Sequence, residues 1–149
     1  MARYAMDAAL RTQILAVAGV SAIVATRLYP DVAPQDEPAG PYGVMTLSGD
    51  ATRGKRLNGG LMKTITARYL IQFFAPTRAA VLSLAALVTA RQQDGGIDGF
   101  RGTMGSGVTA AYVQRCIVEN REDGSVEDES GGEDRSYFAS FDAVATFNE

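Results

Sequence analysis

The sequence contains no histidine, no tryptophan and only one cysteine, Cys116. Without histidine, the chain cannot form a Ser-His-Asp triad, a Cys-His pair or a histidine-containing metal site, and it lacks the best general base near neutral pH. A single cysteine excludes an intramolecular disulfide and fits folding in a reducing cytoplasm. These absences predict a protein that is not an enzyme and has no cofactor or metal. Catalysis through carboxylates or lysines alone stays open as an alternative.

Long apolar runs and a strong charge of one sign are missing as well. Residues 14–26 form the longest strongly apolar stretch, and they are too few to cross a bilayer, which takes about 20 residues. Asp7, Arg11 and Gln13 interrupt the apolar run that a secretion signal would need. The formal net charge of −3 argues against a general nucleic-acid binder, because such domains are usually basic. We therefore expect one domain over residues 1–149, with no membrane span.

Two segments show the apolar period of a helix packed on a core. The first spans residues 6–18, and Gly19 is placed to end it. The second begins after Thr77, which can cap it, and runs to about Gln93. Residues 20–25 form either a further helical turn or the approach to the next element. The two apolar stripes consist of Met6, Leu10, Ile14 and Val17, and of Val81, Leu84, Ala85 and Val88.

Four segments are predicted strands, and the clearest covers residues 63–75. Its alternating pattern predicts one buried face, made of Ile65, Ala67, Tyr69, Ile71 and Phe73. The others cover residues 42–48, 110–121 and 136–147. In the strand over residues 110–121, Val113 and Ile117 are expected on one face. Cys116, a small core residue, is expected on the other face. The order helix, strand, strand, helix, strand, strand predicts an α+β fold, in which two helices pack on one face of an antiparallel sheet of about four strands.

The connections between these elements differ in composition. Four prolines fall within residues 30–41, so we expect no regular element there. The glycine-rich residues 95–107 follow a helix and lack the spacing of a phosphate-binding loop, which predicts a flexible connector. Residues 121–135 hold seven carboxylates and predict a mobile acidic hairpin loop. Their spacing is not that of an EF-hand, so we do not expect a calcium site.

The candidate functional residues are Arg53, Lys55 and Arg56, in a loop expected to start at residue 49. On the simpler reading, these three cations are ordinary solvated surface. On the functional reading, which applies only if copies of the chain form a ring, they lie in a loop that faces the lumen or a neighbouring ring. Repetition around a ring would multiply their charge and let them contact passing DNA or an acidic partner.

A set of segments in a fixed order carries a family resemblance. Arg27-Leu28-Tyr29-Pro30 and a proline-rich link lead into Pro41-Tyr42-Gly43-Val44, and a long strand over residues 67–75 runs directly into the Thr77 helix. A final strand rich in aromatic residues closes the pattern. Over about residues 8–147, the sequence resembles the tail-completion family, which includes the tail terminators of siphophages and is also seen in gene-transfer particles. The glycine-rich stretch and the acidic loop resemble expansions of that pattern.

The resemblance implies a structural virion protein that is assembled in the host cytoplasm. Its copies would form a hexameric ring at the head-proximal end of the tail tube, where the ring ends tube polymerisation and joins tail to head. The implied partners are other copies of the chain, the tail tube protein and the head-closure or connector protein, with non-specific contact to DNA in the lumen. It implies no catalytic residues. Another neck or head–tail joining ring protein, and a small-molecule-binding or carboxylate-using enzyme domain, remain as alternatives.

Overall fold

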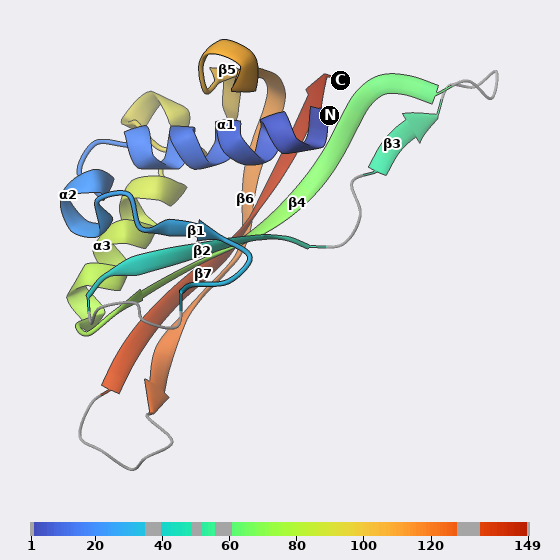
Figure 1. The fold of residues 1–149 in the computed structure, drawn as a ribbon. Coiled ribbons are helices and arrows are strands. Elements are labelled where there is room, and N and C mark those ends of the chain that lie inside the picture. Colours follow the sequence, from blue (N-terminus) through green and yellow to red (C-terminus); the bar gives the residue numbers. More distant parts are fainter. Residues whose placement is uncertain (1, 35–39, 49–51, 56–60, 128–134, 149) are drawn as a thin grey trace.

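The computed structural model describes residues 2–34, 40–48, 52–55, 61–127 and 135–148. These residues form two main helices, a short helix and seven strands (Figure 1). The helices are α1 (Ala2–Ala16), α2 (Val20–Val24) and α3 (Arg78–Thr89), and 3-10 turns occupy Gln92–Asp94 and Gly107–Thr109. The strands are β1 (Leu28–Pro30), β2 (Tyr42–Leu47), β3 (Thr52–Lys55), β4 (Leu61–Ala75), β5 (Phe100–Met104), β6 (Ala111–Glu127) and β7 (Arg135–Asn148).

All seven strands belong to one sheet, in the order β1-β2-β4-β7-β6-β5, and β3 pairs with the first part of β4. Every pairing is antiparallel except the short parallel contact between β1 and β2. The α+β class is therefore confirmed. The sheet has more strands than the expected four because β1, β3 and β5 are three to five residues long. Runs that short hold too few alternations to be distinguished from loop.

The three helices lie together on one side of the strands (Figure 1). One continuous core joins residues of α1, α2 and α3 to the same face of β4 and β7. The predicted buried face of β4 is confirmed, since Ile71 and Phe73 are completely buried and Tyr69 almost so. Burying each such side chain contributes about 1.5–3 kcal/mol. Phe141 and Phe147 of β7 extend this packed face.

The predicted helices are present, with shifted ends. Helix α1 ends at Ala16, and residues 20–25 mostly continue as α2, which starts after Gly19 in a left-handed conformation at φ 91°. Helix α3 is capped as predicted, since the Thr77 hydroxyl accepts a hydrogen bond from the Ala80 N–H. It ends at Thr89 rather than near Gln93, because Ala90 is extended and the following residues return to the helix end, where the Ile97 N–H donates to the Val88 carbonyl. A Cβ on Gly96 would overlap the carbonyl oxygen of Ala90, so only glycine fits at this turn.

Strand β6 corrects the predicted assignment of faces. Val113 and Cys116 are both completely buried on the helix side of the sheet. Ile117 lies on the opposite face, where it pairs with Val144. A register shift between Val113 and Arg115 adds one residue to β6 and reverses the alternation beyond it. The prediction that Val113 and Ile117 share a face was therefore wrong, because strict alternation cannot anticipate a bulge.

Two predicted loops also contain strands. The glycine-rich residues 95–107, expected as a flexible connector, include β5, which pairs with β6. Residues 121–127 of the expected acidic loop belong to β6, and Arg135 belongs to β7. Cross-strand pairing, such as Asp123 with Ala139, holds this acidic segment in the sheet despite its composition. Residues 128–134 lie outside the described residues. In the described part of the chain, no helix is long and apolar enough to cross a membrane.

Candidate assembly surfaces

The face of the sheet opposite the helices, here called the open face, is covered by no described helix. Strands β4 and β7 place Leu70, Gln72 and Phe74 beside Asp142 and Phe138 on this face. All five are half-buried rather than buried. A sheet face of mixed aliphatic, aromatic and polar residues is typical of the surfaces that proteins use for association. The open face is therefore a candidate contact surface.

Aromatic side chains form a row across the open face. The ring centroids of Tyr29 and Tyr42 are 6.5 Å apart, and Tyr42 stacks on Phe74 at 5.2 Å. Phe74 pairs in register with Phe138 of β7. The Phe138 ring in turn lies over the backbone of Gly124 on β6, where a Cβ would be 2.8 Å from the ring. The row thus crosses β1, β2, β4, β7 and β6, and it supplies rigid apolar area at a low cost in side-chain entropy.

A charged network ties three strands together on the same face. The Arg68 guanidinium donates to Asp142 at 2.8 Å and to Glu119 at 3.0 Å. Asn120 donates to the same Asp142 oxygen at 2.8 Å. The hydrogen bond to Asp142, followed by that to Glu119, raises the pKa of Arg68. Because Arg68, Asp142 and Glu119 are already paired with one another, this network is suited to holding β4, β7 and β6 in place rather than to proton transfer. The only signal in the sequence was one arginine on the exposed side of a long strand.

Two of the three predicted basic residues lie on a strand rather than in an open loop. Arg53 and Lys55 belong to β3, and their backbone pairs with Ile65 and Leu61 of β4. Arg56 lies outside the described residues. Strand β3 and the start of β4 extend away from the helices (Figure 1). That these residues face a lumen or a neighbouring ring stays a prediction.

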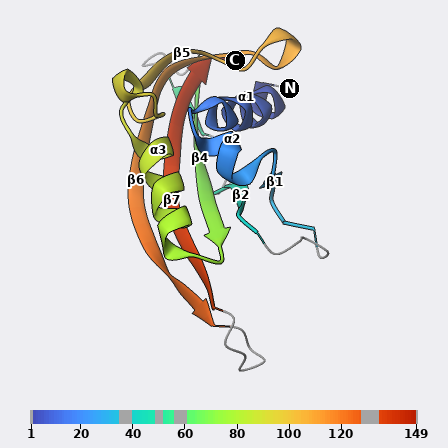
Figure 2. The ribbon, with the colours of Figure 1, turned by 90° about the vertical axis from the view of Figure 1, so that its left-hand side faces the viewer.

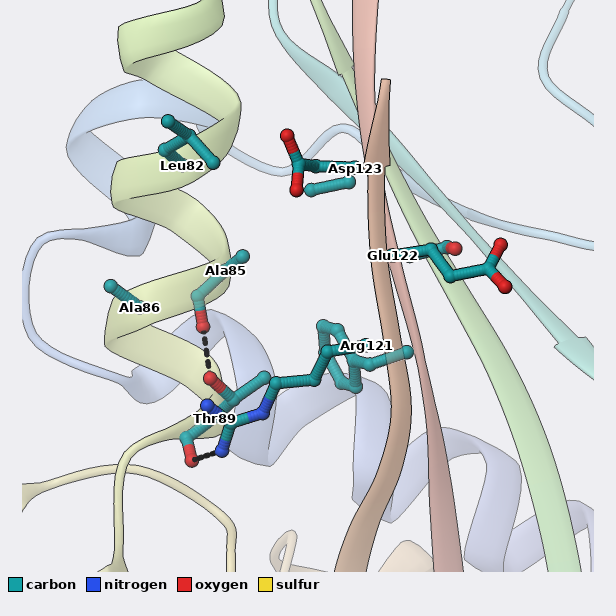
Figure 3. Close-up of a pocket in the computed structure, with 10 residues that line it drawn as sticks. Leu82, Ala85, Ala86, Thr89, Arg121, Glu122 and Asp123 are labelled. Carbon is teal, nitrogen blue, oxygen red and sulfur yellow. Dashed lines mark hydrogen bonds between the residues drawn. The ribbon is translucent and has the colours of Figure 1, made fainter.

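A small pocket lies between α3 and β6, with a volume of about 240 Å³. Figure 3 shows Leu82 and Ala85 of α3 facing this gap, with Asp123 across it and Glu122 pointing away. Arg121 reaches across one end and donates to the Thr89 carbonyl at 3.0 Å. Its lining is mostly apolar, and Leu82 is 41% exposed. Such a pocket can receive an apolar side chain, but its described residues form no nucleophile–base pair.

Cys116 is confirmed as a core residue. Burial, with a smaller contribution from the Asp98 charge, raises the pKa of the Cys116 thiol to about 12. The thiol therefore stays protonated and unreactive at neutral pH. Among the residues that the structure describes, no group of three or more histidine, cysteine, aspartate or glutamate side chains could hold a metal ion.

Comparison with known proteins identifies the fold. No protein-family model and no curated protein matches the sequence. Among solved structures, the fold is similar to that of a chain in the "Virion of native gene transfer agent (GTA) particle", with a TM-score of 0.58. The match covers 96% of this chain and 93% of that chain, at 15% sequence identity. The two chains therefore share a fold over nearly their whole lengths.

Proposed function

We propose that this chain is a structural subunit of a phage-like particle, a tail terminator that forms a ring at the head-proximal end of the tail tube. The observation that carries this proposal is the similarity of fold to a chain of a gene transfer agent virion, which leaves almost no part of either chain unmatched. The tail-completion resemblance of the sequence supports the same assignment. It also implies the antiparallel sheet with helices on one side that the chain forms.

The proposed mechanism is geometric. Identical subunits that join through two different surfaces close into a ring only when the rotation from one subunit to the next is a whole-number fraction of a full circle. For a hexamer this fraction is one sixth. One face of that ring would match the last ring of the tail tube protein. The other face of the ring would bind the head-closure protein. It would not bind a further ring of tube protein, because specificity depends on poor complementarity to the wrong partner as much as on attraction to the right one. Passing DNA would contact the lumen through its phosphates.

Deleting the gene in the producing cell tests this function. We expect tails of uncontrolled length, which fail to attach to heads, in electron micrographs of the lysate. Restoring the wild-type gene should restore tails of uniform length, which serves as the control. Normal tails that merely remain unattached would instead identify a head-side joining ring. Intact particles that lack this chain, combined with tight binding of a metabolite by the purified protein, would favour the enzyme alternative and overturn the proposal.

A further inference from the structure

The outer edge of β6 is only partly paired. Strand β5 pairs with β6 from Ala111 to Cys116. Beyond Cys116, β6 pairs with β7 on its inner side, and no described strand lies on its outer side. The view in Figure 2 shows β6 running along the outer margin of the sheet. Asp98 accepts a hydrogen bond from the Val118 N–H, which covers the first part of this edge. Residues 122–127 therefore offer backbone donors and acceptors to a further strand.

A second edge lies at the opposite margin of the sheet. Strand β3 pairs with β4 alone, and no described strand lies on its other side. Strand β7 occupies the remaining side of β4, and β6 follows β7. The two edges therefore belong to different margins of one sheet. A subunit with two different edges at opposite margins can join its neighbours head to tail, which is the arrangement that generates closed rings.

The two edges carry charges of opposite sign. Strand β3 contains Arg53 and Lys55 and no acidic residue. Residues 122–127 contain three carboxylates and no basic residue. Asp123 forms an ion pair with Arg78 of α3 at 3.2 Å, so Glu122 and Glu127 give this edge its negative charge. Charges on an edge strand normally prevent it from pairing with another chain. Here, like charges oppose pairing of β3 with β3 or of β6 with β6. Opposite charges favour pairing of β3 with β6. The charge pattern thus selects the head-to-tail contact over a two-fold symmetric dimer.

We propose that β3 of one copy adds to the outer edge of β6, residues 122–127, of the next copy, so that the sheets continue from subunit to subunit. Backbone hydrogen bonds would supply the attachment and the charges its direction, as in other cases of strand addition. The pocket between α3 and β6 borders this edge and would receive a side chain of the incoming segment. This contact rests on the proposed function for its place in a particle, but it can be tested separately.

Cross-linking between introduced cysteines tests the contact. A chain with both Thr52→Cys and Ser125→Cys, treated with a short bis-maleimide, should give a ladder of covalent multimers, both as concentrated purified protein and in particles. Each single-cysteine variant should give no ladder, because its cysteine would face a different residue of the neighbour. Cys116 is completely buried and serves as an unreactive background in the parent chain. Absence of the ladder in both settings, or equal dimer formation by a single variant, would overturn the proposal.

Charge reversal tests the direction of pairing. In this cysteine background, Arg53→Glu with Lys55→Glu should reduce the ladder at least tenfold, as should Glu122→Lys with Glu127→Lys. The chain with all four reversals should recover it, since the attraction is restored with the signs exchanged. Reversal of Arg91 and Arg101 to glutamate changes net charge as the β3 reversal does, but lies off both edges, so it should leave the ladder intact. Recovery of the ladder in the chain with all four reversals would also show that misfolding did not cause its loss in the two double reversals.

The outcomes separate this contact from the proposed function. If the chain lies at the neck of the particle and gives no ladder there, the edge contact is wrong while the terminator role stands. If the purified chain gives the ladder with rescue but is absent from particles, the edge contact stands and the terminator role fails. A ladder that all charge reversals leave unchanged would show that the edges do not choose their partners by charge.

Discussion

Cys116 should make the fold sensitive to alkali. Its side chain is completely buried, where β6 pairs with Ala145 of β7 and Phe100 of β5. Burial raises the pKa of the thiol from 9.0 to about 12. Above pH 9 the unfolded chain releases this proton while the folded chain keeps it. The contribution to stability is therefore fully present below about pH 9 and is lost as the pH rises toward 12.

The size of this effect follows from the shift in pKa. The difference is about 12 − 9.0 = 3 pH units, and each unit corresponds to about 1.4 kcal/mol. The thiol should thus lower the free energy of unfolding by about 1.4 kcal/mol per pH unit above 9, which reaches about 2 kcal/mol at pH 10.5 and about 4 kcal/mol at pH 12.

Urea unfolding at pH 7.5, 9.0 and 10.5 measures this effect, with Cys116→Ala as the control. The variant should be less stable than the parent by about 1 kcal/mol at pH 7.5, since it loses a buried sulfur atom. Lysines and tyrosines titrate in both chains, so their effects cancel in the difference. The parent should lose about 2 kcal/mol more than the variant between pH 9.0 and 10.5. Parallel pH profiles for the two chains would refute the assignment of Cys116 to a dry, apolar site.

Three further substitutions test the packing. Ile71→Asp places a charge in the completely buried core and should prevent folding. Gln72→Glu changes the half-buried open face and should keep a cooperative thermal transition. If both variants unfold in similar cooperative transitions, the two faces of β4 have been assigned the wrong way round. Phe141→Ala should cost about 3–5 kcal/mol in urea unfolding, and a cost below about 1 kcal/mol would contradict its place in the core. Gly96→Ala should lower the melting temperature more than Gly95→Ala, because its Cβ would overlap the backbone of Ala90. At Gly95 the added Cβ meets no atom within 4 Å, and the cost is only a backbone strain of about 1–2 kcal/mol. The reverse order of melting temperatures would show that the turn at Ala90 is misplaced.

The composition of the open face suits it to association with a partner. The aromatic row offers apolar area, and the Arg68 network keeps the strands beneath it in fixed register. Neither feature needs to move when a partner binds, so association should cost little conformational entropy. A subunit of a closed ring benefits from this rigidity, because small errors in the angle between neighbours accumulate around the circle.

Strand β4 and helix α3 could be predicted from local sequence alone. Strand β4 alternates apolar and polar residues over its length, and α3 combines a Thr77 cap with an apolar stripe. In these two elements the pattern determines which face is buried, because burial of apolar area dominates the energy of each element. The same reasoning correctly placed Tyr69, Ile71 and Phe73 on the buried face and both helices on one face of the sheet.

Tertiary structure alone decided the short strands, the bulges and the edges. Strand β5 forms in a glycine-rich stretch because β6 supplies the hydrogen-bonding partner, and the extra residue near Val113 turns Cys116 inward. The acidic residues 122–127 are a strand because β7 lies beside them, and they remain an edge because β5 stops at Cys116. Propensity and periodicity act within one segment, whereas pairing and register depend on which distant segment arrives alongside. The residues that could join one copy to the next therefore emerge only when the whole sheet is assembled.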